Sequence, residues 1–473
     1  MWGDTAYLEL WLEDEGHKIS EVDALETDGK KVTWREMLDE IIKRKQFELT
    51  GFSYSSMDEF LTSLYGQYQD FDVGREYLAK EFKSKAKVAW YVDNFGHKHT
   101  TPYVLKTNGF QSMVLGRMSY RQLQKMKANS GLQFMWDSGI NNTEIYTHFL
   151  SNQYEWPSWK FDFDRHDSCN IGELLGILAR FANKQVGIYP HKKQILIIMG
   201  DDFRFVKAEK AFNCLDTLVR AAGSGKYRNW GQGKKQLELR YSTISEYMQS
   251  LQEDKSVQLG SVKGDFGPYN DRRPENYWTG IYSTRPALKY SIRYTERLVK
   301  QAESVFALAK LFARKSVSNS GENLDGIALN STVITLLEGK LTDSQKQLSL
   351  GYHHDSITGV CTAQTYKNYM SRLQEANKKA REIISTCMRA VLNSKEAAKG
   401  GGDIEYVGPS IGTVYGAESV EDEVETQIEQ HGSAYIDSTR CNNDKFYSRI
   451  DSAIELQDIF AVQKDTGTGT EGE

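Results

Sequence analysis

Short apolar runs alternate with helical patterns over residues 1–270, and this alternation restricts the possible folds more than any other feature of the chain. The runs are typical of buried strands and comprise Val88–Val92, Met113–Leu115, Phe134–Trp136 and Ile195–Met199. Helical patterns cover Trp34–Arg44 and Met57–Phe82. Strands that alternate with helices in this way predict a parallel α/β domain, either open or closed into a barrel.

The second half of the chain has a different pattern. Residues 286–316 and 342–396 carry long apolar stripes at helical spacing and are joined by a polar stretch rich in Ser, Asn and Gly, which predicts a helical bundle. From residue 399 the chain is rich in Gly and acidic residues and poor in large apolar ones, so little structure is expected there. The predicted domains are therefore 1–275 (α/β), 276–398 (helical bundle) and 399–473 (poorly structured tail).

Composition narrows the function classes. The hydrophobic content of 39% supports a globular core, and the net charge of −5 gives no sign of a nucleic-acid partner or of binding to an anionic membrane. Five dispersed cysteines allow at most one or two disulfides and contain no CxxC metal motif. We expect no signal peptide and no membrane span in the given chain, because the first residues have no basic start and no apolar run approaches about 20 residues.

Three groups of polar residues stand where parallel α/β domains place their chemistry, just beyond strand ends or beside a helix. They are Asp93 with His97; Asp201, Asp202 and Arg204; and His353, His354 and Asp355. Each group also has a structural explanation: a helix N-cap for the first, an ion-pair network for the second, and a solvated or core cluster for the third. Together they supply what hydrolysis of a glycosidic bond requires, namely two carboxyl groups and a possible zinc site.

Five sequence blocks carry a resemblance to a known family. They read D-N-F-G-H (93–97), G-D-D-F-R (200–204), G-D-F-G-P-Y (264–269), N-Y-W-T-G-I-Y-S-T-R-P (276–286) and H-H-D-S-I-T-G (353–359). In wording and order they resemble glycoside hydrolase family 38, the class II α-mannosidases, over about residues 1–395. The residues around Asp93 and the block G-D-D-F-R resemble the sequences of the Golgi mannosidase II branch more than those of the lysosomal branch.

The resemblance implies a retaining α-mannosidase that acts on terminal α-mannosyl linkages of N-glycans in the Golgi, the lysosome or elsewhere in the secretory pathway. Asp93 matches the catalytic nucleophile, which also binds zinc, and Asp202 matches the acid/base. His354 matches a second zinc ligand, and Zn²⁺ would hold the vicinal hydroxyls of mannose. The substrate-binding and supporting positions are Phe95, Arg117, Tyr154, Asp201, Arg204, Trp278 and Asp355.

The adjacent carboxylates of the G-D-D block have a physical explanation under this resemblance. An acid catalyst must hold a proton for part of the time, and an anion at Asp201 would help Asp202 to retain it. The guanidinium of Arg204 is expected to act in the opposite direction.

The chain also departs from the family. It contains no H-x-D-P-G-W block, so two of the family's four zinc ligands and a strand that would close the barrel are expected to be missing; the first residues already resemble the second strand and the helix after it. Asn94 and Glu155 replace the family's usual Pro and Asp, and the residues after 400 do not resemble the family's large C-terminal β domains. Two alternatives therefore remain: a truncated, inactive relative that at most binds mannose-type carbohydrate, and a metal-dependent hydrolase of the deacetylase kind.

Overall fold

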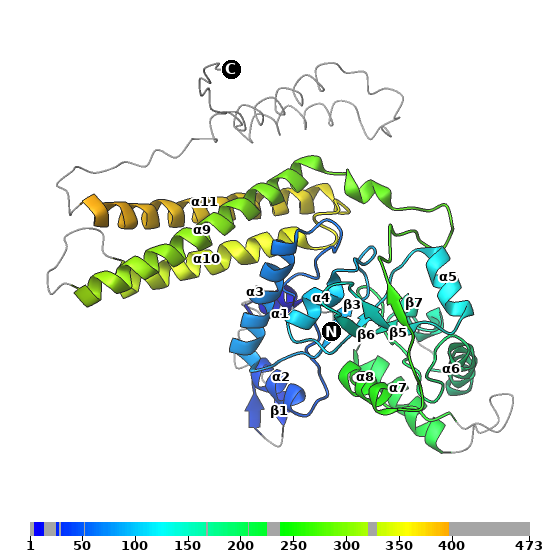
Figure 1. The fold of residues 1–473 in the computed structure, drawn as a ribbon. Coiled ribbons are helices and arrows are strands. Elements are labelled where there is room, and N and C mark those ends of the chain that lie inside the picture. Colours follow the sequence, from blue (N-terminus) through cyan, green and yellow to red (C-terminus); the bar gives the residue numbers. More distant parts are fainter. Residues whose placement is uncertain are drawn as a thin grey trace, which may run out of the picture. The chain divides into compact units, whose positions relative to one another are not determined.

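The computed structural model describes residues 4–13, 25–27, 30–51, 53–166, 169–206, 208–224, 237–319 and 329–396 (Figure 1). All of these residues belong to one compact unit, Met1–Ile404. The tail predicted for residues 399–473 lies outside the described residues.

A five-stranded sheet forms the centre of the α/β part. Its spatial order is β3 (Val88–Tyr91), β4 (Ser112–Leu115), β6 (Glu144–Phe149), β5 (Gln133–Asp137) and β8 (Ser261–Lys263). The first three strands are parallel to one another, whereas β5 pairs antiparallel with β6 and parallel with β8. The predicted α/β class is confirmed, and among the described residues the sheet is open, as expected of a barrel-like domain that lacks its first strand. The sheet is mixed, however, instead of wholly parallel.

Both faces of the sheet are mostly buried at β3, β4 and β6, as the apolar character of the predicted strands β3 and β4 indicated, whereas the edge strand β8 is largely exposed. Successive side chains of a strand point to opposite faces. Ala89 and Tyr91 of β3 accordingly join the largest core cluster, which also contains Val104 and Leu105 of α4 (Thr101–Thr107). Val88, on the opposite face, packs in a second cluster together with Tyr247, Met248 and Leu251 of α8 (Ile244–Glu253).

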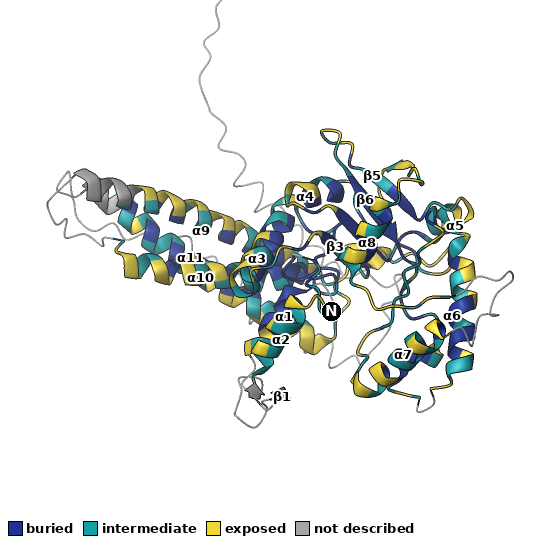
Figure 2. Ribbon diagram, turned by 90° about the horizontal axis from the view of Figure 1, so that it is seen from below, coloured by how far each residue is buried: buried dark blue, intermediate teal, exposed yellow. Residues whose placement is uncertain are grey.

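The remaining elements of the α/β part surround this sheet (Figures 1 and 2). They are α1 (Thr5–Glu13), β1 (Leu25–Thr27), β2 (Lys30–Val32), α2 (Trp34–Lys43), α3 (Leu64–Phe82), α5 (Tyr120–Ala128), β7 (Ser151–Tyr154), α6 (Ile171–Val186) and α7 (Ala208–Gly223). Short 3₁₀ turns lie at Trp159–Phe161 and Thr279–Tyr282.

Two predicted elements differ from the structure. Ile195–Met199 is not paired into a strand; Leu196 and Ile198 pack toward the α8 side of the sheet, and Ile197 and Met199 pack toward α6 and α7. The continuous apolar run of this segment thus reflects packing on two sides, and among the described residues no strand pairs with it. The helix predicted from Met57 begins only at Leu64, where the Ser63 side chain accepts a hydrogen bond from the Gly66 amide.

Three long helices form the rest of the described chain: α9 (Pro286–Asn319), α10 (Ser331–Tyr352) and α11 (Ala363–Glu396). They pack on one another, and α10 also packs on α3 (Figure 1). The predicted stretch 342–396 is therefore two helices, interrupted by the segment that contains His353 and His354. Their inner faces are buried and their outer faces exposed, as expected of amphipathic helices (Figure 2).

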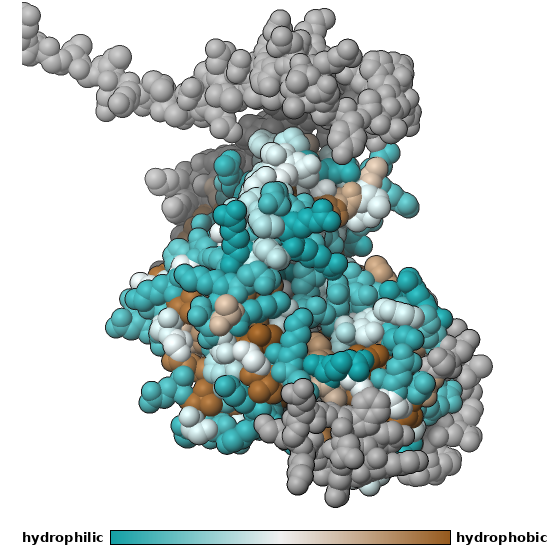
Figure 3. Space-filling model, turned by 90° about the vertical axis from the view of Figure 1, so that its right-hand side faces the viewer, coloured by the Kyte–Doolittle hydropathy of each residue, from teal (hydrophilic) through white to brown (hydrophobic). Residues whose placement is uncertain are grey.

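The surface is mostly polar. On the face shown in Figure 3, hydrophilic side chains predominate and hydrophobic ones are scattered between them. Among the described residues, we find no helix with the length and apolar character needed to cross a bilayer.

Candidate active site

Three of the predicted site residues stand at the carboxyl ends of neighbouring strands. Asp93 follows β3, Arg117 follows β4, and Tyr154 ends β7, which continues from β6. Because β3, β4 and β6 are parallel, these ends lie at the same edge of the sheet. The order and direction of the strands therefore bring these three residues to one edge of the sheet.

Asp93 is held by two cationic partners. Arg117 forms a salt bridge with one oxygen of its carboxylate, and the other oxygen lies 3.3 Å from Nε2 of His354. Burial acts to raise the pKa of Asp93, but the hydrogen bond from His354 and the charge of Arg117 outweigh it and hold that pKa below its usual value. Asp93 is therefore an anion, as a nucleophile must be.

A glycine makes the approach of Asp93 and Arg117 possible. Gly116 precedes Arg117, and a Cβ atom added to it would lie 1.9 Å from the carbonyl oxygen of Val92, the residue before Asp93. No side chain fits at that distance. The absence of a side chain at Gly116 thus allows the ends of β3 and β4 to lie close enough for the ion pair.

Aromatic rings surround the guanidinium of Arg117. Its Cζ lies 5.4–5.9 Å from the ring centroids of Phe95, Tyr154, Tyr269 and Trp278. Phe95 is only 2% exposed, and its ring packs against Arg117 and His354. Trp278 is partly exposed. Sequence reasoning missed Tyr269, whose hydroxyl accepts a hydrogen bond from Arg117 at 3.0 Å, although it ends the quoted G-D-F-G-P-Y block.

The His353–Asp355 segment lies directly after α10. Asp58 donates its backbone N–H to Tyr352, and Met57 bridges to His353, which fixes the segment against the chain before α3. Nδ1 of His353 donates to the Ser55 carbonyl at 2.6 Å, and Nδ1 of His354 donates to the Ser56 carbonyl at 2.7 Å. The backbone carbonyls thus fix both rings through Nδ1 and direct the Nε2 atoms into the site, where that of His354 lies 3.3 Å from Asp93 and that of His353 lies 3.8 Å from Asp355. In a neutral imidazole, an Nε2 oriented in this way can bind a metal ion through its lone pair.

The charges around His354 favour the protonated, cationic form of its imidazole. Burial acts to lower its pKa, but the hydrogen bond and charge of Asp93, together with Asp355 and Asp4, raise it to about 9. Side-chain ligand atoms of His353, His354 and Asp355 lie within 4.8 Å of one another. Imidazole and carboxylate together suit Zn²⁺, so the residues that are present fit the metal that the resemblance implies.

Asp202 joins the same site from a different segment. Its Oδ2 accepts a hydrogen bond of 3.5 Å from the Tyr154 hydroxyl. Burial raises the pKa of Asp202, and the negative charges of Asp93 and Asp201 raise it further, while Arg117 opposes them. The surroundings thus shift the pKa values of the two carboxyl groups in opposite directions, down for Asp93 and up for the solvent-exposed Asp202.

The expected role of Arg204 needs correction. Its guanidinium lies 3.6 Å from a carboxylate oxygen of Asp162 and 3.6 Å from one of Asp201, and it stacks near Trp156. Arg117, not Arg204, is the cation that lowers the pKa of Asp202. Asp162 is a buried residue at the end of the 3₁₀ turn, and it was not a candidate from the sequence because nothing in its neighbouring residues distinguishes it from other acidic residues.

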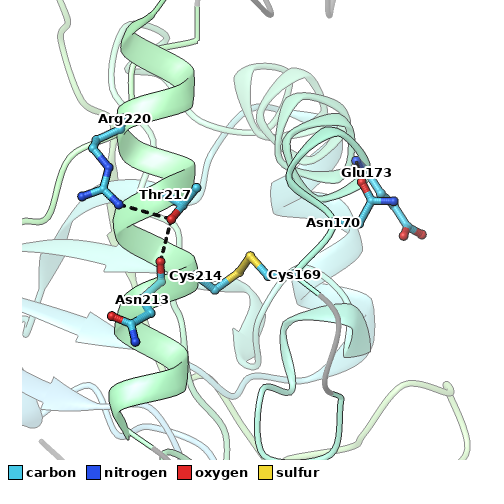
Figure 4. The surroundings of a disulfide bond; sticks show 7 residues. All are labelled: Cys169, Asn170, Glu173, Asn213, Cys214, Thr217 and Arg220. Atoms are coloured by element: carbon cyan, nitrogen blue, oxygen red, sulfur yellow. Dashed lines mark hydrogen bonds between the residues drawn. A yellow bond between two sulfur atoms is a disulfide. The ribbon is translucent and has the colours of Figure 1, made fainter.

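A disulfide lies near the segment that carries Asp202. Cys169, just before α6, is bonded to Cys214 in the middle of α7 (Figure 4). The loop that it closes contains Asp202, and the cluster around Cys214 also contains Ile197 and Met199. This bridge is within the one or two expected, and it connects the chain before and after the segment that contains Asp202.

Comparison with known proteins gives the same assignment. Residues 19–272 match the glycosyl hydrolases family 38 N-terminal domain, and residues 276–391 match the alpha mannosidase middle domain. The chain belongs to glycosyl hydrolase family 38. The two matched regions meet between residues 272 and 276, where the α/β part gives way to the segment leading into α9.

The chain is similar to named members of this family over most of its own length. It is 26% identical to alpha-mannosidase F of Dictyostelium discoideum over 84% of this chain and 37% of the relative. It is also 26% identical to alpha-mannosidase 2 of Mus musculus, over 84% of this chain and 35% of the relative. The chain therefore spans about a third of the length of these curated relatives.

A solved structure shares the fold. A crystallised alpha-mannosidase from Enterococcus faecalis V583 superposes with a TM-score of 0.59 at 16% identity, covering 83% of this chain and 37% of that one. The likeness supports the arrangement of the sheet and the long helices in this family 38 chain.

Proposed function

We propose that this family 38 chain is a retaining α-mannosidase that cleaves terminal α-mannosyl linkages of N-glycans. The observation that carries the proposal is the opposite perturbation of two carboxyl groups in one site: the pKa of Asp93 is lowered and that of Asp202 is raised. A retaining glycosidase needs this division, because one carboxylate attacks while the other carboxylic acid donates a proton.

Each group then has a definite task. The Asp93 carboxylate attacks the anomeric carbon and forms a glycosyl-enzyme, while the proton of Asp202 goes to the departing oxygen. Asp202, now a carboxylate, takes a proton from water as that water displaces Asp93 and releases the sugar with retained configuration. Arg117 orients Asp93, and Tyr154 orients Asp202.

The proposed metal site is held by Asp93 and His354. When bound, Zn²⁺ supplies Lewis-acid contacts to the vicinal hydroxyls of mannose. The remaining contacts to the sugar are assigned to Trp278 and Asp355, the partly exposed side chains around the site. We assign the chemistry to residues 1–275 and a supporting role to the helical bundle 276–398.

We also propose that the protein is located in the Golgi, the lysosome or elsewhere in the secretory pathway, because the Cys169–Cys214 disulfide would be stable there.

The test compares two leaving groups. Asp202→Asn should lower kcat/KM strongly for an aryl α-mannoside whose leaving group needs a proton. It should leave the first step nearly unchanged for a 2,4-dinitrophenyl α-mannoside, whose leaving group does not, so that a glycosyl-enzyme accumulates. Asp93→Asn should abolish turnover of both substrates, because the nucleophile is lost.

Asp72→Asn is the matched control. Asp72 is an exposed carboxylate that pairs with Arg75, and its removal should leave both substrates unaffected. Equal rates for wild type and Asp93→Asn would remove Asp93 from the mechanism. Binding of mannosides without any hydrolysis would support instead the inactive, carbohydrate-binding relative.

A further inference from the structure

Two adjoining cavities lie beside the candidate active site. The first, of about 370 Å³, has Arg117 in its wall and extends over α5 and the end of β7. The second, of about 300 Å³, lies against α6 and shares Lys127, Ser151 and Asn152 with the first. Cavities of this size are at the lower end of the range for small-molecule sites. The shared residues connect the second cavity, through the first, with the edge of the sheet that carries Arg117.

The wall of the second cavity is positively charged. Among the residues that the structure describes, it contains three cations and no carboxylate: Lys127 comes from α5, and Arg180 and Lys184 come from α6. The other lining residues are neutral, and they are Ser151, Asn152, Pro157, Ile177, Phe181, Gln185 and Ile188. The charge of the three cations is therefore not compensated within the cavity.

The three cations also lack partners elsewhere. Within the described part of the chain, none of their side chains forms a salt bridge or a hydrogen bond. Arg180 and Lys184 stand four positions apart on α6, so they project from one face of the helix, where like charges repel. Burial lowers the pKa of Lys127, and the charge of Lys184 lowers it further. An anion bound among these groups would remove the repulsion.

Two of these cations also have a structural explanation. Lys127 and Lys184 lie in the last turns of α5 and α6, where the helix dipole favours a positive charge. That explanation does not account for Arg180, which lies one turn earlier, or for a cavity wall without acidic residues. In the first cavity, by contrast, both acidic side chains lie within 3.6 Å of Arg272. The second cavity is thus the one whose charges await an anionic ligand.

We propose that the second cavity binds the phosphate group of a phosphorylated hexose. A phosphomonoester carries about two negative charges at pH 7 and three acceptor oxygens, which suits a wall with three cations. Phe181 adds a flat apolar surface to the same wall, on which a sugar ring packs. We assign the phosphorylated residue to the oligosaccharide whose terminal mannose enters the site around Asp93, and only this assignment rests on the proposed function.

The decisive variant is Arg180→Gln/Lys184→Gln, which removes two of the three cations and keeps polar side chains. Its affinity for mannose 6-phosphate, measured by isothermal titration calorimetry at fixed salt, should be at least about 10-fold below that of wild type. The matched control is Arg121→Gln/Lys125→Gln. It removes an identical pair of charges, also four positions apart, from a part of α5 that lines neither cavity, and it should bind as wild type does.

Thermal melting separates a loss of binding from a loss of fold. Both double variants should melt at or slightly above the wild-type temperature, because each removes a pair of like charges from one helix face. If Arg180→Gln/Lys184→Gln melts lower, Lys184→Gln alone gives the comparison, because Lys184 is an exposed residue. Its affinity for mannose 6-phosphate should still fall below that of the control.

Mannose and inorganic phosphate are the other two probes. Affinity for mannose should not differ between the variants, and inorganic phosphate should bind wild type more weakly than mannose 6-phosphate does. Equal affinities of wild type and Arg180→Gln/Lys184→Gln for mannose 6-phosphate would overturn the proposal. Inorganic phosphate that binds as tightly as mannose 6-phosphate would also overturn it, because the cavity would then be a site for a free anion only.

The remaining outcomes distinguish this inference from the proposed function. A wild-type chain that binds mannose 6-phosphate through these cations but hydrolyses no α-mannoside would support the phosphate site and overturn the enzymatic proposal. Hydrolysis of α-mannosides by a chain that does not bind mannose 6-phosphate would overturn the phosphate site and leave the enzyme.

Discussion

Replacing Gly116 by Ala should disrupt the site through the backbone. The added Cβ atom would lie 1.9 Å from the Val92 carbonyl oxygen, whereas real Cβ contacts are essentially never below 3.0 Å. The two atoms must therefore separate by about 1.1 Å (3.0 − 1.9). Because the obstacle is a backbone carbonyl and not the end of a flexible side chain, the ends of β3 and β4 must move apart.

This displacement acts on the residues next in sequence, Asp93 and Arg117. A misplacement of about 1 Å in a catalytic arrangement lowers the rate about 100-fold, which corresponds to about 2.7 kcal/mol. Overpacking of a well-packed region also destabilises by about 1–3 kcal/mol. We therefore expect kcat/KM for an aryl α-mannoside to fall about 100-fold and the urea midpoint of unfolding to fall together with it.

Gly260→Ala is the matched control for this prediction. A Cβ atom added at Gly260 meets no atom within 4 Å, so the same chemical change should leave both measurements near wild type. If Gly116→Ala had the same urea midpoint and the same kcat/KM as Gly260→Ala, the strand ends would not be in the close contact described above. The account of how Asp93 and Arg117 are positioned would then be refuted.

Three further predictions test the surroundings of the site. Asp201→Asn removes a charge that raises the pKa of Asp202, so the alkaline limb of the kcat/KM profile should move to lower pH; an unmoved limb would exclude this coupling. Replacing Cys169 and Cys214 by Ser opens a loop with a sequence separation of 45 and should lower the unfolding free energy by about 4 kcal/mol, measured in urea against the oxidised wild type; a loss below about 1 kcal/mol would contradict it. Burial raises the pKa of Asp70 to about 8, so the contribution of protonated Asp70 to the free energy of unfolding is fully present below about pH 4 and is lost as the pH rises toward 8. Asp70→Asn should therefore gain stability relative to wild type at pH 8 compared with pH 4. An equal difference between the two proteins at both pH values would argue against this raised pKa.

Sequence patterns predicted the elements whose signals are local. The apolar runs of β3 and β4 and the stripes of the long helices agree with the structure, because strand and helix periods are properties of adjacent residues. The same reasoning was wrong for Ile195–Met199, because apolar residues on both sides of an extended segment do not require a strand partner. Sequence patterns also could not predict that β5 is antiparallel to β6, because the direction of a strand depends on its pairing with another part of the chain.

The candidate site shows the same division. The sequence by itself determined which groups are proposed to carry the chemistry, because the sequence blocks around Asp93, Asp202 and His354 are specific and contiguous. Only the tertiary structure decided which charges act on them: Arg117, not Arg204, opposes the raised pKa of Asp202. It also placed Nε2 of His354 only 3.3 Å from the carboxylate of Asp93, a residue far earlier in the chain. Electrostatic and metal-ligand interactions depend on distance in space, and a sequence gives that distance only between neighbours.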